Sequence, residues 1–347
     1  MSRAERETGL TWIIILNWNG YRDTIECVES CRRLQHPARR ILVVDNGSTD
    51  GSERVLRDRW TDVNFLQTGA NLGYSGGNNV GIRYALDRGA AYVWLLNNDA
   101  RVAPDCLTHM VESVSDDRQV GIVGGKIYCL DRPNVIWSAG GTLDLAAGGA
   151  ARHIGENRED QGGYDAPACV DYVPGCSMLV RRETFSSIGL LDENYFLYFE
   201  DVDFCLRART EGWTVRYEPR AKAWHREGSR KHGLFSATFI YYFLRNRLYL
   251  MKRFAPRHMW RCHCRQLELI AFLLFKTPVR RDPRGLAEVG MLAVRSYLDF
   301  YIYRAMGPER RGQIPPPPLG TGADEPDDLA GPGTGEPAPA RREARLS

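Results

Sequence analysis

The sequence predicts an α/β fold with a mainly parallel sheet flanked by helices, followed by a helical C-terminal region. Between residues 12 and 96, apolar runs of strand length alternate with segments of helical periodicity. This alternation is typical of βαβ units with right-handed crossovers. The chain has 347 residues, 43% of them apolar, which is enough to bury such a core and carry an appendage.

The first hundred residues predict four strands and three helices. The strands are expected near 12–16, at 41–44, near 63–67 and at 92–96. The helices are expected between them, near 22–35, 51–60 and 77–88. In open sheets of this kind, ligands bind outside the carboxyl ends of the strands. The polar residues that follow each strand should therefore gather at one rim of the sheet.

From about residue 120 the pattern changes to shorter strands and turns. We expect a strand at 120–123, a glycine-rich hairpin at 136–149 and a polar loop at 153–167. A strand at 213–217 follows, and helical segments extend from about 235 to 306. Beyond Pro308 the chain is rich in proline, glycine and charge, with almost no aliphatic residues, which predicts disorder.

Acidic residues stand at three element ends. Glu200, Asp201 and Asp203 lie among apolar residues where a helix begins. Asp45 and Asp99 each follow an apolar strand. Helix capping explains one or two carboxylates at a helix N-terminus but not the two at strand ends. The pattern therefore predicts one active site built from all three places.

Composition excludes several other classes of protein. The formal net charge is +3, from 46 basic and 43 acidic side chains, so a general field for binding nucleic acid is not expected. No N-terminal segment has the features of a secretory signal, which predicts a cytoplasmic protein. The nine cysteines are scattered and odd in number, and this favours reduced core thiols over a disulfide framework.

Five short motifs occur in a recognisable order: Asn17-Trp-Asn-Gly20, residues 43–51, residues 71–79, Leu95-Leu-Asn-Asn-Asp99 and Phe199-Glu-Asp-Val-Asp203. Together they resemble family-2 glycosyltransferases with the GT-A fold, and are most similar to the rhamnosyltransferase-like branch. The resemblance covers about residues 10–230. It implies a GT-A domain over 1–230, with a nucleotide-sugar-binding half at 10–100 and an acceptor and catalytic half at 101–230. A helical region at 231–307 and a disordered tail at 308–347 would follow.

The resemblance also implies which residues hold the donor. Asp45 would bind the base of the nucleotide, and a glycine-rich loop at 76–78 would let the backbone approach it closely. Asp99 would bind a divalent metal, Mg²⁺ or Mn²⁺, with His225 completing the site; a structural histidine is the alternative reading of His225. The element before Asp99 offers one carboxylate, where many members have two or three. The nucleotide-sugar-binding set implied by the motifs is Asn17, Asn19, Asp45, Asn71, Gly73, Gly76, Gly77, Asn78 and Asn98.

In the chemistry that this family implies, Asp201 is the general base that deprotonates the acceptor hydroxyl. Glu200 would position the acceptor, and Asp203 is interpreted as a first-turn helix residue. A single displacement of this kind inverts the anomeric centre. The leading donor is dTDP-rhamnose, with UDP-sugars as the alternative, and the acceptor would be a saccharide, a lipid-linked glycan or a small molecule. A binding module without turnover is the non-enzymatic alternative, and retention of Asp99, Glu200 and Asp201 disfavours it.

The C-terminal helices mix aromatic, aliphatic and basic residues. No run reaches the roughly 18 uninterrupted apolar residues that a membrane span requires. Two interpretations of these helices follow from the sequence. The helices lie in a membrane interface, at the inner face of the plasma membrane, or they cover the catalytic domain and pair with a second subunit in a homo-oligomer.

Overall fold

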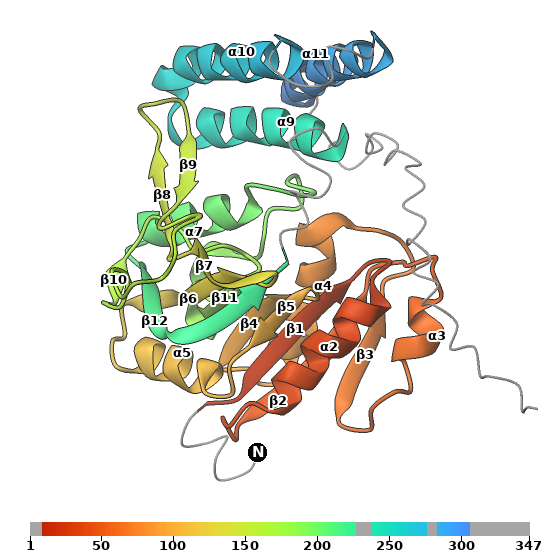
Figure 1. The fold of residues 1–347 in the computed structure, drawn as a ribbon, viewed down its shortest axis with the longest axis vertical. Coiled ribbons are helices and arrows are strands. Elements are labelled where there is room, and N and C mark those ends of the chain that lie inside the picture. The colour runs from red at the N-terminus through yellow and green to blue at the C-terminus, as the bar shows by residue number, and fades with distance from the viewer. Residues whose placement is uncertain (1–8, 227–236, 276–282, 306–347) are drawn as a thin grey trace, which may run out of the picture. The chain divides into compact units, whose positions relative to one another are not determined.

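The computed structural model describes residues 9–226, 237–275 and 283–305 (Figure 1). All of them belong to one unit of the chain, residues 1–315. The second unit, residues 316–347, and the tail predicted to be disordered lie outside the described residues.

The N-terminal half contains the four predicted strands in parallel. Their order in the sheet is β3-β2-β1-β4, with β1 paired to both β2 and β4. The strands are β1 (Thr11–Asn17), β2 (Arg39–Asp45), β3 (Val63–Gln67) and β4 (Tyr92–Asn97). The helices between them are α2 (Tyr21–Arg32), α3 (Ser52–Leu56) and α4 (Gly73–Asp87). Each strand matches its predicted position, whereas α3 ends earlier and α4 begins four residues earlier than predicted.

The sheet continues into the second half with mixed directions. Beyond β4 the order is β11-β6-β12-β10, with β11 antiparallel to both β4 and β6, and β12 parallel to β6. The short strands β5 and β7 pair at the side, with β12 and β6. The bounds are β5 (Ala100–Val102), β6 (Val120–Cys129), β7 (Arg132–Ser138), β10 (Ala168–Cys169), β11 (Ser177–Arg181) and β12 (Thr214–His225). The helices of this half are α5 (Cys106–Ser115), α6 (Arg182–Ile188) and α7 (Glu200–Thr210).

Both faces of the sheet are buried. Along β1, Trp12 and Ile14 enter one apolar cluster, and Ile13 and Ile15 enter the other. A strand buried on both faces has a continuous apolar sequence, which is why β1, β2 and β4 could be predicted from it. Cys27 packs in the second cluster on α2, in agreement with a core thiol.

A hairpin stands apart from the main sheet. Strands β8 (Gly141–Asp144) and β9 (Ala150–His153) form it, somewhat later in the chain than the predicted 136–149. The polar loop after it is anchored, because Asp160 accepts hydrogen bonds from buried Lys126 at 2.8 Å and from Tyr128 at 2.6 Å.

The predicted C-terminal helical region is helical wherever it is described, apart from a short connection. It comprises α9 (Ala237–Phe254), the 3-10 turn η2 (Pro256–His258), α10 (Met259–Phe275) and α11 (Pro283–Ala305). One apolar cluster joins Ile240 and Leu244 of α9 with Leu273 of α10 and Val289 of α11. Helix α9 therefore lies with α10 and α11 on one side and the segment before α7 on the other (Figure 1). Within the described ranges, no helix is long and apolar enough to cross a membrane.

Candidate active site

The strand register brings the predicted loops to one rim. Asn17 at the end of β1 lies opposite Asp45 at the end of β2, and Leu16 lies opposite Asn97 at the end of β4. The carboxyl ends of three strands are therefore level with one another.

Asp45 is the centre of a closed polar network. Its carboxylate is fully buried and accepts hydrogen bonds from Asn17 Nδ2 at 2.6 Å, Ser48 Oγ at 2.6 Å and Gln67 Nε2 at 2.5 Å. Asn19 joins the network, because its backbone N–H donates to Ser48 Oγ at 2.9 Å. An open cavity of about 560 Å³ borders this loop at Ser48 and the residues that follow. The Ser48 backbone N–H is a fourth donor, at 3.4 Å, so a base could contact the Asp45 carboxylate only if one of these donors moved.

The prediction of a glycine-rich loop at 76–78 is wrong, because these residues are helical. Helix α4 already begins at Gly73, so Gly76, Gly77 and Asn78 lie inside it and are buried. A Cβ at Gly77 would lie 2.5 Å from Leu16 Cδ1, so this glycine allows α4 to pack against β1. The Asn78 amide donates to the Tyr74 carbonyl at 2.9 Å. The glycines that resemble a nucleotide-binding loop thus serve close packing of helix on sheet.

The turn before α4 is also internally bonded. Asn71 Oδ1 accepts hydrogen bonds from Gly73 N at 2.9 Å and from Asn46 Nδ2 at 3.0 Å. Gly73 has a φ of +73°, and a Cβ there would lie 2.5 Å from the Phe196 carbonyl oxygen. Only glycine suits this position, because both the backbone conformation and the close contact exclude a side chain.

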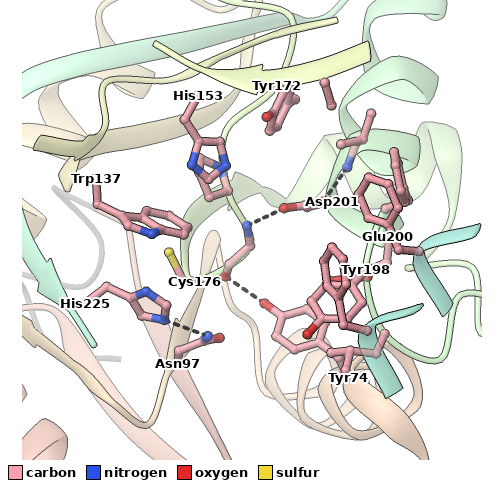
Figure 2. A pocket seen from close by; sticks show the side chains of 18 of the residues that line it. Tyr74, Asn97, Trp137, His153, Tyr172, Cys176, Tyr198, Glu200, Asp201 and His225 are labelled. Atoms are coloured by element: carbon pink, nitrogen blue, oxygen red, sulfur yellow. Dashed lines mark hydrogen bonds between the residues drawn. The ribbon is translucent and has the colours of Figure 1, made fainter. Parts of the chain in front are cut away.

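A second cavity, of about 550 Å³, lies beside the end of β4 (Figure 2). Its walls come from β4, the β7 and β9 strands, the 174–176 segment, the start of α7, the end of β12 and α9. Two of the three acidic places predicted to form one site line it, Asp99 with His225 and Glu200 with Asp201, whereas Asp45 does not. None of the nine residues implied for nucleotide-sugar binding lines this cavity.

Asp99 and His225 face each other although they are far apart in sequence. They meet because β12 continues to His225, which pairs with Ala100 of β5. Asp99 Oδ1 lies 3.1 Å from His225 Nε2, but the contact is not a well-directed hydrogen bond, and Oδ1 is buried with no other partner. His225 Nε2 also lies 3.2 Å from Asn97 Nδ2. Burial raises the pKa of Asp99, yet His225 and Arg226 outweigh it, and the net pKa lies below the usual value.

These two groups fit a divalent ion. An ionised carboxylate oxygen without a hydrogen-bond partner, beside an imidazole nitrogen, is the donor set expected of a small metal site completed by other ligands. Across the part of the chain that the structure describes, no group of three or more His, Cys, Asp or Glu side chains could hold a metal. Asn98, in contrast, turns away: its amide donates to Thr24 Oγ1 at 3.1 Å and to the Gly20 carbonyl at 3.3 Å.

Asp201 is held on the opposite wall of the cavity by backbone donors (Figure 2). Its Oδ2 accepts from Gly175 N at 3.0 Å and its Oδ1 from Val202 N at 2.8 Å. Burial raises the pKa of Asp201, and these two N–H groups with His153 offset part of the rise. Glu200 is more deeply buried, and its Oε2 has no hydrogen-bond partner. Burial and the charge of Asp201 raise the pKa of Glu200 well above its usual value.

Asp203 points away from this cavity. It is fully buried and receives Arg207 Nε at 2.7 Å and Arg253 Nη1 at 3.0 Å. Its first-turn position on α7 agrees with the prediction, but the two arginines make it an ion-paired core residue.

Several cavity residues were not predicted from the sequence. His153 at the end of β9 lies with its ring 4.4 Å from that of Trp137, and burial lowers the pKa of His153. Phe239 and Phe243 of α9 line the same cavity, beside Tyr198 and Phe199. The aromatic run 239–244 was visible in the sequence, but its contact with residues forty positions earlier was not.

Comparison with known proteins agrees with this geometry. The family model for glycosyl transferase family 2 matches residues 12–188. An N-acetylglucosaminyl-diphospho-decaprenol L-rhamnosyltransferase from Mycobacterium tuberculosis is 32% identical over 204 residues, which cover 53% of this chain and 66% of the relative. A low-salt glycan biosynthesis hexosyltransferase from Haloferax volcanii is 30% identical over 207 residues, which cover 59% of this chain and 65% of the relative. The matches therefore span just under two thirds of each relative.

A solved structure shares the fold. It is a mannosyltransferase from Pyrobaculum calidifontis in complex with GDP-Man and Mn²⁺, with a TM-score of 0.51 and 14% identity, covering 87% of this chain and 77% of that chain. The GT-A fold expected from the sequence is confirmed. With its parallel β3-β2-β1-β4 core and its match over 12–188, the chain belongs to glycosyl transferase family 2.

Proposed function

We propose that the chain is an inverting glycosyltransferase that moves a sugar from a nucleoside-diphosphate sugar to a hydroxyl group. The observation that carries this proposal is the shared cavity. Asp99 and His225 line one side of it, and Asp201 with Glu200 lines another. A donor diphosphate and an acceptor hydroxyl could thus meet in one cavity.

Asp201 is proposed as the general base. Its oxygens are fixed by Gly175 and Val202, so the carboxylate has a defined direction in the cavity. Burial raises the pKa of Asp201, and a base with a higher pKa accepts the proton of a hydroxyl more readily. Glu200, whose raised pKa favours a protonated carboxyl, would donate a hydrogen bond that orients the acceptor.

Asp99 and His225 are proposed to hold Mg²⁺ or Mn²⁺. Such an ion, when bound, would neutralise the charge that develops on the departing nucleoside diphosphate. The lowered pKa of Asp99 keeps this carboxylate ionised and ready to coordinate. Asn97 Nδ2 lies 3.2 Å from His225 Nε2, so the Asn97 amide would have to give up this contact when His225 binds the ion.

The nucleotide is proposed to lie at the rim formed by Asn17, Asn19 and Asp45, beside the cavity at Ser48. Asp45 would hold this loop in place through its hydrogen bonds with Asn17 and Ser48. It could contact the base directly only if one of its hydrogen-bond donors moved away. The name of the mycobacterial relative supports rhamnose as the sugar, and a relative from Shigella flexneri is named a dTDP-rhamnosyl transferase, which supports dTDP-rhamnose as the donor. The name of the Haloferax relative supports a hexose as the alternative, for which we propose a UDP-sugar as the donor.

The acceptor side has an aromatic wall of Tyr198, Phe199, Phe239 and Phe243. Aromatic rings stack on sugar rings and also contact apolar chains. The mycobacterial relative is named for a lipid-linked acceptor. A lipid-linked glycan is therefore the favoured acceptor class, ahead of a free saccharide or a small molecule.

A membrane surface is the proposed partner of the outer face of α10 and α11. Trp260 and Leu267 of α10 are 60% and 62% exposed, and Met291, Val294 and Leu298 of α11 are 54–65% exposed at helical spacing. Exposed Arg257, Arg261 and Arg265 lie at the Trp260 end of this face. Apolar side chains beside arginines suit an anionic lipid surface, at the inner face of the plasma membrane. A second copy of the chain is the alternative occupant.

A panel of nucleotide sugars tests the enzymatic proposal. Purified protein is incubated with dTDP-rhamnose, UDP-hexoses and GDP-mannose, with Mn²⁺ or with chelator, and release of nucleoside diphosphate is measured. We expect one donor to be turned over in a metal-dependent way. Donor binding without turnover, in the presence of lipid-linked and soluble acceptors, would favour the binding module instead.

A further inference from the structure

We infer that Asn246 of helix α9 is a positioning residue that holds the catalytic carboxylates by fixing the turn before α7. The inference rests on the proposed role of Asp201 as base. Asn246 lies outside the cavity lining and outside every motif that carries the family resemblance.

The turn before α7 has an unfavourable backbone. Tyr198 and Phe199 have φ values of +70° and +71°, in succession, and the helix starts at the next residue, Glu200. Residues with a β-carbon seldom adopt this left-handed conformation, and for bulky side chains such as these two it is an outlier. Such a conformation persists only where the surroundings hold it.

Asn246 fixes this turn by hydrogen bonds. Its side chain is 1% exposed, and its amide nitrogen donates both hydrogens to consecutive carbonyls of the turn, Leu197 O at 2.8 Å and Tyr198 O at 2.9 Å. Arg245 Nη1 donates to Asn246 Oδ1 at 3.1 Å, which fixes the direction of the amide. If the peptide group of Leu197 or Tyr198 rotated, its carbonyl would lose this buried hydrogen bond to Asn246.

Other residues of α9 also contact the turn and the first residues of α7. The ring of Phe199 packs 5.2 Å from Phe243, and that of Tyr198 packs 5.4 Å from Phe239. One turn into α7, Arg253 pairs with Asp203. Helix α9 therefore contacts the start of α7 on both sides of Asn246.

The position of Asp201 depends on this turn. Asp201 is the second residue of α7, and its hydrogen bonds to Gly175 N and Val202 N require α7 to start where it does. If the turn relaxed to negative φ, the first turn of α7 would shift and Asp201 would lose its alignment. A misplacement of about 1 Å in an active site can reduce a rate by about a hundredfold.

The experiment compares Asn246→Ala and Asn246→Asp with Gln266→Ala. Gln266 is a matched control, since it is a fully buried amide that donates to the α9 carbonyl of Leu244 at 2.6 Å but does not touch the turn. Asn246→Asp keeps the volume and the acceptor for Arg245 and removes the two donors, so it serves if the alanine variant does not fold.

We expect kcat to fall by at least about tenfold in the Asn246 variants, while binding of dTDP or UDP with Mn²⁺ stays within about twofold. The acid limb of the pH profile should move, because both the burial that raises the pKa of Asp201 and the Gly175 N–H and His153 contacts that lower it depend on where α7 starts. Gln266→Ala should lower the melting temperature and leave kcat and the pH profile unchanged. Equal kcat in the Asn246 variants and wild type, or an equal loss in Gln266→Ala, would overturn the inference.

Hydrogen exchange separates this inference from the proposed function. Amides of the peptide covering 197–203 should exchange faster in the Asn246 variants than in Gln266→Ala. If wild type turns over no nucleotide sugar, the enzymatic proposal fails, yet faster exchange still shows that Asn246 holds the turn. If exchange at 197–203 is unchanged, Asn246 does not hold it, whatever the activity.

Discussion

Glu200 occupies an electrostatically unfavourable position. The unfolded chain ionises this carboxyl near pH 4.5, whereas in the folded protein burial and Asp201 raise its pKa well above that value. Above pH 4.5 the folded state therefore keeps this proton while the unfolded state loses it, so stability falls as pH rises from 4.5 toward the raised pKa. Glu200→Gln removes the ionisation, and the variant should melt above wild type at pH 7.5, with the gain disappearing below about pH 4.5. A lower melting temperature at pH 7.5 would contradict the assignment.

Asp203 should behave as a structural residue. Replacing it with asparagine leaves Arg207, whose side chain is only 11% exposed, without its carboxylate, and breaking a buried ion pair typically costs about 3–5 kcal/mol. This exceeds what a first-turn residue alone would contribute, roughly 1 kcal/mol. Denaturant unfolding measures the difference. Asp62→Asn, at an exposed pair with Arg32, is the control and should leave the free energy of unfolding nearly unchanged, because solvent screens such a pair. Equal costs in the two variants would show that the Asp203 pair contributes little.

At the scale of elements, the strands could be predicted and the loops only in part. Strands β1, β2 and β4 have continuous apolar sequences because both faces of the sheet are covered. The start of α4 was missed because Gly73, Gly76 and Gly77 resemble a loop, although Gly77 lets the helix lie close to β1 and Gly73 lets it lie close to Phe196. The strand predicted at 213–217 was too short, because the irregularity between Glu218 and Lys222 interrupts the alternation before β12 continues to His225.

The candidate site shows the same division. Asp99, Glu200, Asp201 and His225 could be named because they stand in motifs at element ends, and all four line the cavity. His153 and Asn246 could not, since no local pattern marks them and their partners lie far along the chain. Contacts across such distances follow from the packing of the hairpin and α9, which local periodicity does not encode.

For the whole molecule, the proposed membrane surface predicts binding to vesicles. The protein should co-sediment with vesicles that contain anionic lipid, and binding should weaken with salt, because charges are screened beyond about 8 Å at physiological ionic strength. Serine at Trp260, Leu267 and Met291 together should abolish it. Leu72→Ser, at an exposed leucine elsewhere, is the control. The alternative outcome is a stable dimer that does not bind vesicles and that dissociates in the triple variant. This outcome would show that a second copy of the chain covers this face.

The central claim is that one cavity joins the donor to a base at Asp201. The most direct test is the transfer rate of Asp201→Asn at saturating donor, measured beside its donor affinity. The amide keeps the shape of the side chain but cannot take the acceptor proton, so transfer should fall by roughly a hundredfold or more while donor binding barely changes. Near-normal transfer by Asp201→Asn would contradict the account.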